Sequence, residues 1–475
     1  MSVPWTLTLL STLLAAPLAG ATMNPPAVLS LSSEVIQERL MQKLRDHEAS
    51  NVLQQLPLLS AIQKKPAGVM PTFNNMVNFV LKYIVWIKVT SANILQLQVQ
   101  PSVNNQELVV KIPLDMTASF NTPLVKTLVQ LRMESEVQIT IRVENWGKAR
   151  SHLVLRDCFN MQDSLHIGVL QKISFLIRTL ADKVINLLTP VLPRLVNEHL
   201  CPVINEAFED MQNDLLGLVK APVAVMSNHL EFDLLSPAIK GNSVQLNMKA
   251  KMLDSQGKVT KQFNESAPSM TMPAVNNARV SLTVRQDLLN AAVAVLIPPE
   301  EVMVLFDYMF PELALWLKSS IKLINEKAAN QLEHTQVVKV YSHKTPELIL
   351  NQGRATVAQL IMLEVYATNQ IRRPFFTLGI EASSDAHFSM EGDQVILKVN
   401  NIRCDRIHLL NSGLGLFNPE LLKDITTEIL VTVLLPHENG KLKAGVPVSM
   451  VKALGLKEMT CFLTKDALVV TSVSS

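Results

Sequence analysis

Apolar residues near the start of the chain recur at the spacing of an α-helix. Between positions 31 and 56 they return every fourth residue, which places them on one face of a helix. Ser32 and Ser33 offer an N-cap, and Pro57 marks the expected end. The face expected to be apolar is formed by Ile36, Leu40 and Leu44.

The spacing changes to two between residues 78 and 170. Leu95, Leu97 and Val99 alternate with glutamines, and similar alternation recurs over residues 108–116 and 137–143. A period of two puts the apolar side chains of a strand on one face of a sheet. We therefore expect the strands of an antiparallel meander with one apolar face.

A second long helix follows the meander. Ile173, Ile177, Leu180 and Val184 return to helical spacing, and the pattern continues to about residue 218. Pro190 and Pro193 interrupt the hydrogen bonding of any helix that contains them, so we expect a kink there.

The second half of the chain repeats this order of elements. Residue identity between the halves is weak, so the duplication is inferred from element order alone. We expect strands over 223–253, an apolar helix over 300–330, strands over 336–410, a helix over 419–435 and closing strands to 473. The domains would be an N-terminal lobe (22–222), a central sheet or linker region (223–253) and a C-terminal lobe (254–475).

Residues 1–21 are typical of a secretory signal peptide. An apolar stretch over residues 5–16 is followed by Ala19 and Ala21, the small residues that signal cleavage requires. A membrane anchor is the alternative, but the stretch is well short of the roughly 20 residues that span a bilayer. Charges interrupt the later apolar segments, so we expect a secreted chain without a transmembrane anchor.

The composition favours packed aliphatic helices and sheets. Of the 475 residues, 48% are hydrophobic and 5% aromatic, and the mean hydropathy is +0.22. A chain of this length exceeds a single hydrophobic core. Sheets with one apolar face and amphipathic helices can bury each other in elongated α+β lobes. An incomplete fit between them leaves an apolar cavity.

Charge and motifs argue against several classes of function. The 43 Lys and Arg residues against 41 Asp and Glu give a net charge of +2, which lacks the long-range attraction that nucleic-acid binding uses. The sequence contains no HExxH, GxSxG or GxxxxGK[ST] motif, and its ten histidines are scattered. We expect no enzyme activity, cofactor, metal site or nucleic-acid partner.

Several stretches in both halves carry a resemblance to a known family. They are VLQQLPLLSA (52–61), ANILQLQV (92–99), VKIPLDM (110–116), FNTPLVKT (120–127), LEFDLLSPAIKG (230–241), DSQGKVTK (254–261), KSSIKLINEKAA (318–329), FTLGIEASS (376–384) and GVPVSMVKALG (445–455). Through them the chain resembles the bactericidal/permeability-increasing, lipopolysaccharide-binding and PLUNC superfamily over essentially its full length.

The resemblance implies a fold and a set of binding residues. The fold is a boomerang of two BPI-like lobes, each a twisted antiparallel sheet packed on long amphipathic helices, with a central sheet joining the lobes. The family's disulfide falls on Cys158 and Cys201, while Cys404 and Cys461 are left over and could equally be paired or free. Each lobe would hold an apolar lipid pocket, or a filled core in its place, with Ile36, Leu40, Leu44, Ile173, Ile177, Leu180 and Val184 as candidate lining residues.

Family members that neutralise endotoxin bind the phosphates of lipid A through a cationic tip on the first lobe. Here residues 22–218 hold 18 Lys and Arg against 17 Asp and Glu, so that attraction is nearly absent. The candidate contacts are Lys64, Lys65, Lys148 and Arg150, which fit solvated turns at least as well. We therefore expect modest affinity for lipopolysaccharide and modulation of its signalling.

The function implied is that of a secreted lipid-binding protein of mucosal innate immunity. Its partners would be bacterial lipopolysaccharide, phospholipid or other amphiphiles. Asn264 begins an Asn-Glu-Ser sequon and is a candidate glycosylation site. The alternatives are a lipid-transfer protein and a surface-active mucus component that holds no ligand.

Overall fold

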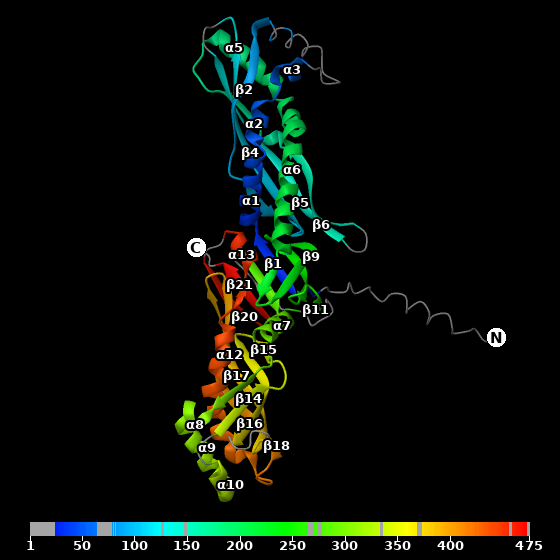
Figure 1. Ribbon diagram of the computed structural model, residues 1–475. Helices are drawn as coiled ribbons and strands as arrows, with labels where there is room; N and C mark the ends of the chain where they lie inside the picture. Colours follow the sequence, from blue (N-terminus) through cyan, green and yellow to red (C-terminus); the bar gives the residue numbers. More distant parts are fainter. Residues whose placement is uncertain are drawn as a thin grey trace, which may run out of the picture.

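The protein is elongated and has two lobes, which a central sheet joins (Figure 1). Its computed structural model describes residues 24–63, 78, 80, 82–124, 128–146, 150–263, 270, 272, 278–332, 336–367, 373–455 and 458–472.

The N-terminal lobe contains an antiparallel sheet of six strands, in the order β2-β4-β5-β6 with β3 paired to β4 and β7 to β5. The apolar alternation predicted from the sequence is confirmed in β4, where every second residue is buried from Leu108 to Met116. The strands are β2 (Trp86–Ile94), β3 (Gln98–Pro101), β4 (Glu107–Asn121), β5 (Val129–Trp146), β6 (Arg150–Asn160) and β7 (His166–Val169).

The first predicted helix of this lobe begins two residues later than expected and is interrupted between Asp46 and Ala49. Residues 27–32 form strand β1, and the Ser32 hydroxyl then accepts a hydrogen bond from Val35 N at 3.5 Å as the N-cap. The break follows from Glu48, whose left-handed backbone (φ 51°) cannot continue a right-handed helix. The helices are α1 (Ser33–Asp46), α2 (Ala49–Gln54) and α3 (Leu58–Gln63).

The second predicted helix is two helices, α5 (Phe175–Leu188) and α6 (Leu192–Lys220). They separate beside Pro190 and Pro193, because proline has no N–H to donate to the preceding turn. Helix α6 runs along the N-terminal lobe beside α1 and β6 and ends at the central sheet (Figure 1).

The central sheet draws on more of the chain than the predicted segment 223–253. Its order is β20-β21-β12-β1-β10-β9-β8, with β11 paired to β10. Strand β1 comes from the start of the described chain and β20–β21 from its end, so both lobes contribute to one sheet. The strands are β1 (Ala27–Ser32), β8 (Val223–Val225), β9 (Asn228–Lys240), β10 (Ser243–Leu253), β11 (Val259–Gln262), β12 (Val280–Arg285), β20 (Met459–Thr464) and β21 (Ala467–Ser472).

The C-terminal lobe repeats the plan with the sheet β13-β14-β16-β17-β18-β19, to which β15 is added through β16. Its strands are β13 (Glu301–Leu305), β14 (Gln336–Ser342), β15 (Glu347–Asn351), β16 (Arg354–Ala367), β17 (Phe376–Glu391), β18 (Gln394–Ser412) and β19 (Val446–Pro447). Its helices are α7 (Gln286–Leu296), α8 (Phe306–Met309), α9 (Pro311–Ile324), α10 (Glu326–Gln331), α11 (Lys423–Ile429), α12 (Leu435–Leu442) and α13 (Ser449–Ala453), with a 3₁₀ turn (Pro419–Leu422) and a π-helical turn (Leu430–Leu434).

Two expectations for this lobe are wrong in detail. The first residues of the predicted helix 300–330 form β13, in which Val302 and Val304 alternate with more exposed neighbours as in a strand. Helix α7 was not predicted at all.

The buried apolar residues form two clusters. One runs from the N-terminal lobe through the central sheet to α7 and the near end of the C-terminal lobe, and the other fills the far end of the C-terminal lobe. Within the described residues, no helix is both long enough and apolar enough to cross a membrane.

Candidate functional site: an apolar cavity beside the central sheet

An apolar cavity lies where the central sheet meets the C-terminal lobe. It is bounded by β8, β9, β12 and β21 of the central sheet, by α7, and by β17, β18, β19 and α13 of the C-terminal lobe. The volume open to the centre of a water molecule is about 70 Å³.

Helix α7 supplies one wall of the cavity. Leu288, Ala292 and Leu296 recur every four residues, and Leu289 and Val293 lie beside them on the same face. An alanine in the middle of this face leaves room that a larger residue would fill.

The start of α7 is fixed by Arg285, the last residue of β12. Its buried guanidinium donates two hydrogen bonds to the Asp287 carboxylate, both of 2.7 Å, and one to the Asn24 carbonyl at 2.7 Å. Asp287 in the first turn also suits the positive end of the helix dipole. Strand β12 and α7 are thereby held as adjoining walls.

Another wall is the segment that leads from Val446 into α13. Gly445 precedes it with a φ of 62°, and a Cβ there would lie 2.5 Å from Ile396 Cδ1 and 3.0 Å from Val395 O. Only glycine fits so close to β18 in this conformation. The close approach sets Val446 and Pro447 against the cavity, where β19 pairs with β18 at two positions.

The cavity can hold hydrocarbon and little else. Among the residues that line it, Ser449 is the one with a polar side chain. A buried water molecule needs roughly two to four polar partners, which these walls do not offer. The fitting occupant is therefore an apolar group, such as part of an acyl chain.

The predicted lining residues of the N-terminal lobe lie elsewhere. Ile36, Leu40, Leu44, Ile177, Leu180 and Val184 are buried in the larger core cluster, and Ile173 is partly buried against it. None of the seven lines the cavity described above. A pocket bounded by them stays a prediction.

The arrangement of the predicted cationic contacts stays a prediction. Lys64, Lys65 and Lys148 lie outside the described residues, and for Arg150 only the backbone, at the start of β6, is described. Helix α3, which ends at Gln63, is at the far end of the N-terminal lobe, whereas the β5–β6 hairpin is near the central sheet (Figure 1).

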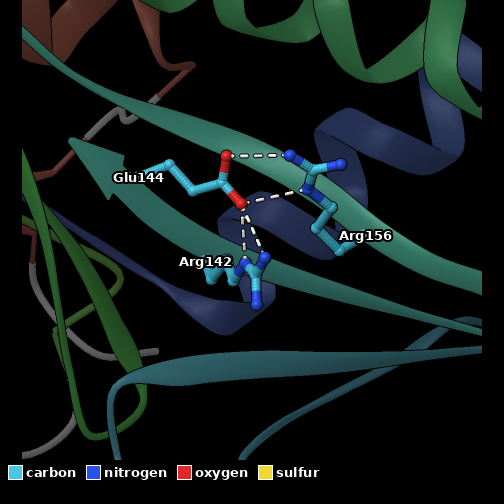
Figure 2. Close-up of polar contacts among 3 residues, drawn as sticks. All are labelled: Arg142, Glu144 and Arg156. Carbon is cyan, nitrogen blue, oxygen red and sulfur yellow. Dashed lines mark hydrogen bonds and ion pairs between the residues drawn. The ribbon is translucent and has the colours of Figure 1, made fainter. Parts of the chain in front are cut away.

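A cluster of charges lies near the Arg150 end of this hairpin (Figure 2). The Glu144 carboxylate accepts hydrogen bonds from Arg156 Nη2 at 2.9 Å and from Arg142 Nη2 at 2.7 Å. The hydrogen bonds from Arg156 and then Arg142 lower the pKa of Glu144 to about 2. Glu144 therefore stays ionised and engages guanidinium donors that could otherwise bind phosphate.

The structure contains the Cys158–Cys201 disulfide, which joins β6 to α6 with a Cα–Cα distance of 6.0 Å. Cys404 and Cys461 are free. Residues 1–21 and Asn264 lie outside the described residues, so the signal peptide and the glycosylation site stay predictions.

Sequence reasoning missed the residues that line the cavity. Two of the stretches that carry the family resemblance do contain some of them: LEFDLLSPAIKG holds Leu230 and Phe232, and GVPVSMVKALG holds residues 446–450. The apolar, alanine-rich run of α7 that begins at Leu288 was the other available signal.

Comparisons with known proteins agree with this architecture. Residues 43–211 match the model of the LBP / BPI / CETP family, N-terminal domain, and residues 226–472 that of the C-terminal domain. BPI fold-containing family B member 1 of Homo sapiens is 57% identical over 474 residues, which cover 100% of this chain and 98% of that protein. The protein of the same name from Mus musculus is 51% identical over 475 residues, covering 100% of both.

A solved structure shows the same fold. The crystal structure of lipopolysaccharide binding protein matches with a TM-score of 0.53 at 13% identity, over 94% of this chain and 98% of that one.

Proposed function

Because the chain belongs to the LBP / BPI / CETP family, we propose that it is a secreted lipid-binding protein that holds acyl chains of amphiphiles in the cavity beside α7. The amphiphiles would include phospholipid and bacterial lipopolysaccharide. By binding the latter the protein would moderate responses to bacteria at mucosal surfaces.

The observation that carries this proposal is the apolar lining of the cavity. Each methylene that moves from water into such walls contributes about 0.8 kcal/mol. The gain depends on hydrocarbon and hardly on headgroup identity, so the cavity alone would accept acyl chains of several lipids. The known structure of lipopolysaccharide binding protein supports the fold only.

Identification of bound lipid is the direct test. Protein secreted from mammalian cells should release phospholipid or another amphiphile on solvent extraction, as detected by mass spectrometry. Delipidated protein should then take up a fluorescent fatty acid in a saturable way. If neither lipid release nor uptake is observed, the proposal is wrong.

Ala292→Phe is expected to weaken fatty-acid binding by about tenfold, measured by fluorescence titration. The added ring takes space from the bound acyl chain, and the loss of about two buried methylenes is worth roughly that factor. Ala292 is buried in the α7 wall.

Ala453→Phe is the matched control, because Ala453 is an exposed residue of α13 that does not line the cavity. It should bind as the wild type does. Circular dichroism should show both variants folded, and unchanged binding by folded Ala292→Phe would place the ligand elsewhere.

A further inference from the structure

A second hollow adjoins the apolar cavity. It is an open groove between the edge strand β20 of the central sheet and strands β16, β17 and β18 of the C-terminal lobe, with about 710 Å³ open to the centre of a water molecule. Unlike the cavity, it is lined by polar and apolar groups together, among them Arg354, Asp385, His387 and Arg403.

Phe388 is common to the two hollows, since this partly buried residue of β17 lines both of them. The β20–β21 hairpin does so as well. Cys461 and Leu463 of β20 line the groove, and their cross-strand partners Val470 and Leu468 line the cavity. Directly paired residues project from the same face of a sheet, so these four residues share one face of the hairpin, whereas Phe462, which also lines the groove, projects from the other face.

The groove has an excess of positive charge. Asp385 is engaged by Arg403 Nη2 at 3.4 Å and by Asn401 Nδ2 at 3.0 Å. Arg354 is exposed at the start of β16, and its side chain forms no ion pair or hydrogen bond with any other described residue. Burial raises the pKa of the Cys461 thiol, so this residue adds no negative charge near neutral pH.

We propose that this groove is the headgroup site for a phosphate-bearing amphiphile whose acyl chain passes Phe388 into the cavity. Guanidinium groups suit this role because they bind phosphate oxygens with paired, charge-assisted hydrogen bonds. The inference rests on the proposed function and extends it, since the cavity alone selects hydrocarbon while the groove selects an anionic phosphate.

Two lipids that differ in one phosphate test the site. Delipidated full-length protein is titrated calorimetrically with 1-oleoyl lysophosphatidic acid and with 1-monooleoylglycerol, each below its critical micelle concentration. The wild type is expected to bind the phosphate-bearing lipid about tenfold more tightly, the effect of one good hydrogen-bonded charge pair. The double variant Arg354→Gln/Arg403→Gln should lose this preference and keep its affinity for monooleoylglycerol.

Arg406→Gln is the matched control. Arg406 is exposed on β18, pairs with Glu381 at 3.8 Å and does not line the groove. This variant should retain the preference of the wild type.

Any other result of these titrations contradicts the proposed headgroup site. An unchanged preference in the double variant would remove the headgroup site while cavity binding stands, and equal losses for both lipids would show that the arginines support the fold instead. If the wild type binds neither lipid, the proposed function fails as well.

Glycerol 3-phosphate distinguishes a lipid headgroup from free phosphate, because it carries the phosphate without the tail. It should bind at least about a hundredfold more weakly than the lysolipid, since it buries no acyl chain. Comparable affinities would make the groove a free-phosphate site and contradict the proposal.

Discussion

Replacing both cysteines of the disulfide, in Cys158→Ser/Cys201→Ser, is expected to lower the free energy of unfolding by about 4 kcal/mol. The bridge closes a loop of 43 residues, and such a closure removes chain entropy from the unfolded state by this amount. Because the bridge joins β6 to α6, the N-terminal lobe should be the part that is destabilised. Urea unfolding followed by circular dichroism measures it.

A reductant provides the control for this prediction. Dithiothreitol should destabilise the wild type by the same amount and leave the double variant unchanged, because Cys404 and Cys461 are free thiols already. Coincident urea transitions for the oxidised wild type, the reduced wild type and the double variant would show that the bridge contributes nothing to stability.

The sequence predicted the strands of the meanders better than the ends of the helices. From Glu107 to Ala118, strand β4 alternates strictly between partly exposed and buried residues, so its period alone identifies it. The break between α1 and α2 depends on the backbone of Glu48, which is not a glycine and gives no sequence signal. Strand β13 was assigned to a helix because a short apolar run fits either period.

The cavity could not be located from the sequence because its walls come from distant segments. Leu230 of β9, Leu288 of α7 and Leu468 of β21 meet only through the pairing of the central sheet. An amphipathic face such as Ile36, Leu40 and Leu44 has the same pattern whether it packs against a filled core or an empty space. Periodicity identifies which side chains are buried. Where a cavity remains depends on how closely the helices and sheets pack against each other.

A buried carboxyl group in the C-terminal lobe is expected to make the free energy of unfolding depend strongly on pH. Glu438 of α12 is 1% exposed, and its two oxygens accept hydrogen bonds of 3.0 and 3.1 Å from Gln359 Nε2 of β16. The Oε1 atom of the same glutamine is buried without a hydrogen-bond partner among the described residues. Burial raises the pKa of Glu438 from its ordinary value of 4.5 to about 7, against the opposing effects of Gln359 and Lys441.

Glu438→Gln is therefore expected to stabilise the protein by about 3 kcal/mol at pH 8 and by little at pH 4.5. A carboxyl whose pKa is higher in the folded state binds its proton more tightly there, so its contribution is complete below pH 4.5 and is lost as the pH rises through 7. Glutamine stays neutral throughout and can donate to the unpartnered Gln359 Oε1. Urea unfolding of both proteins between pH 4.5 and 8 measures the difference, and a constant offset across this range would mean that Glu438 does not titrate there.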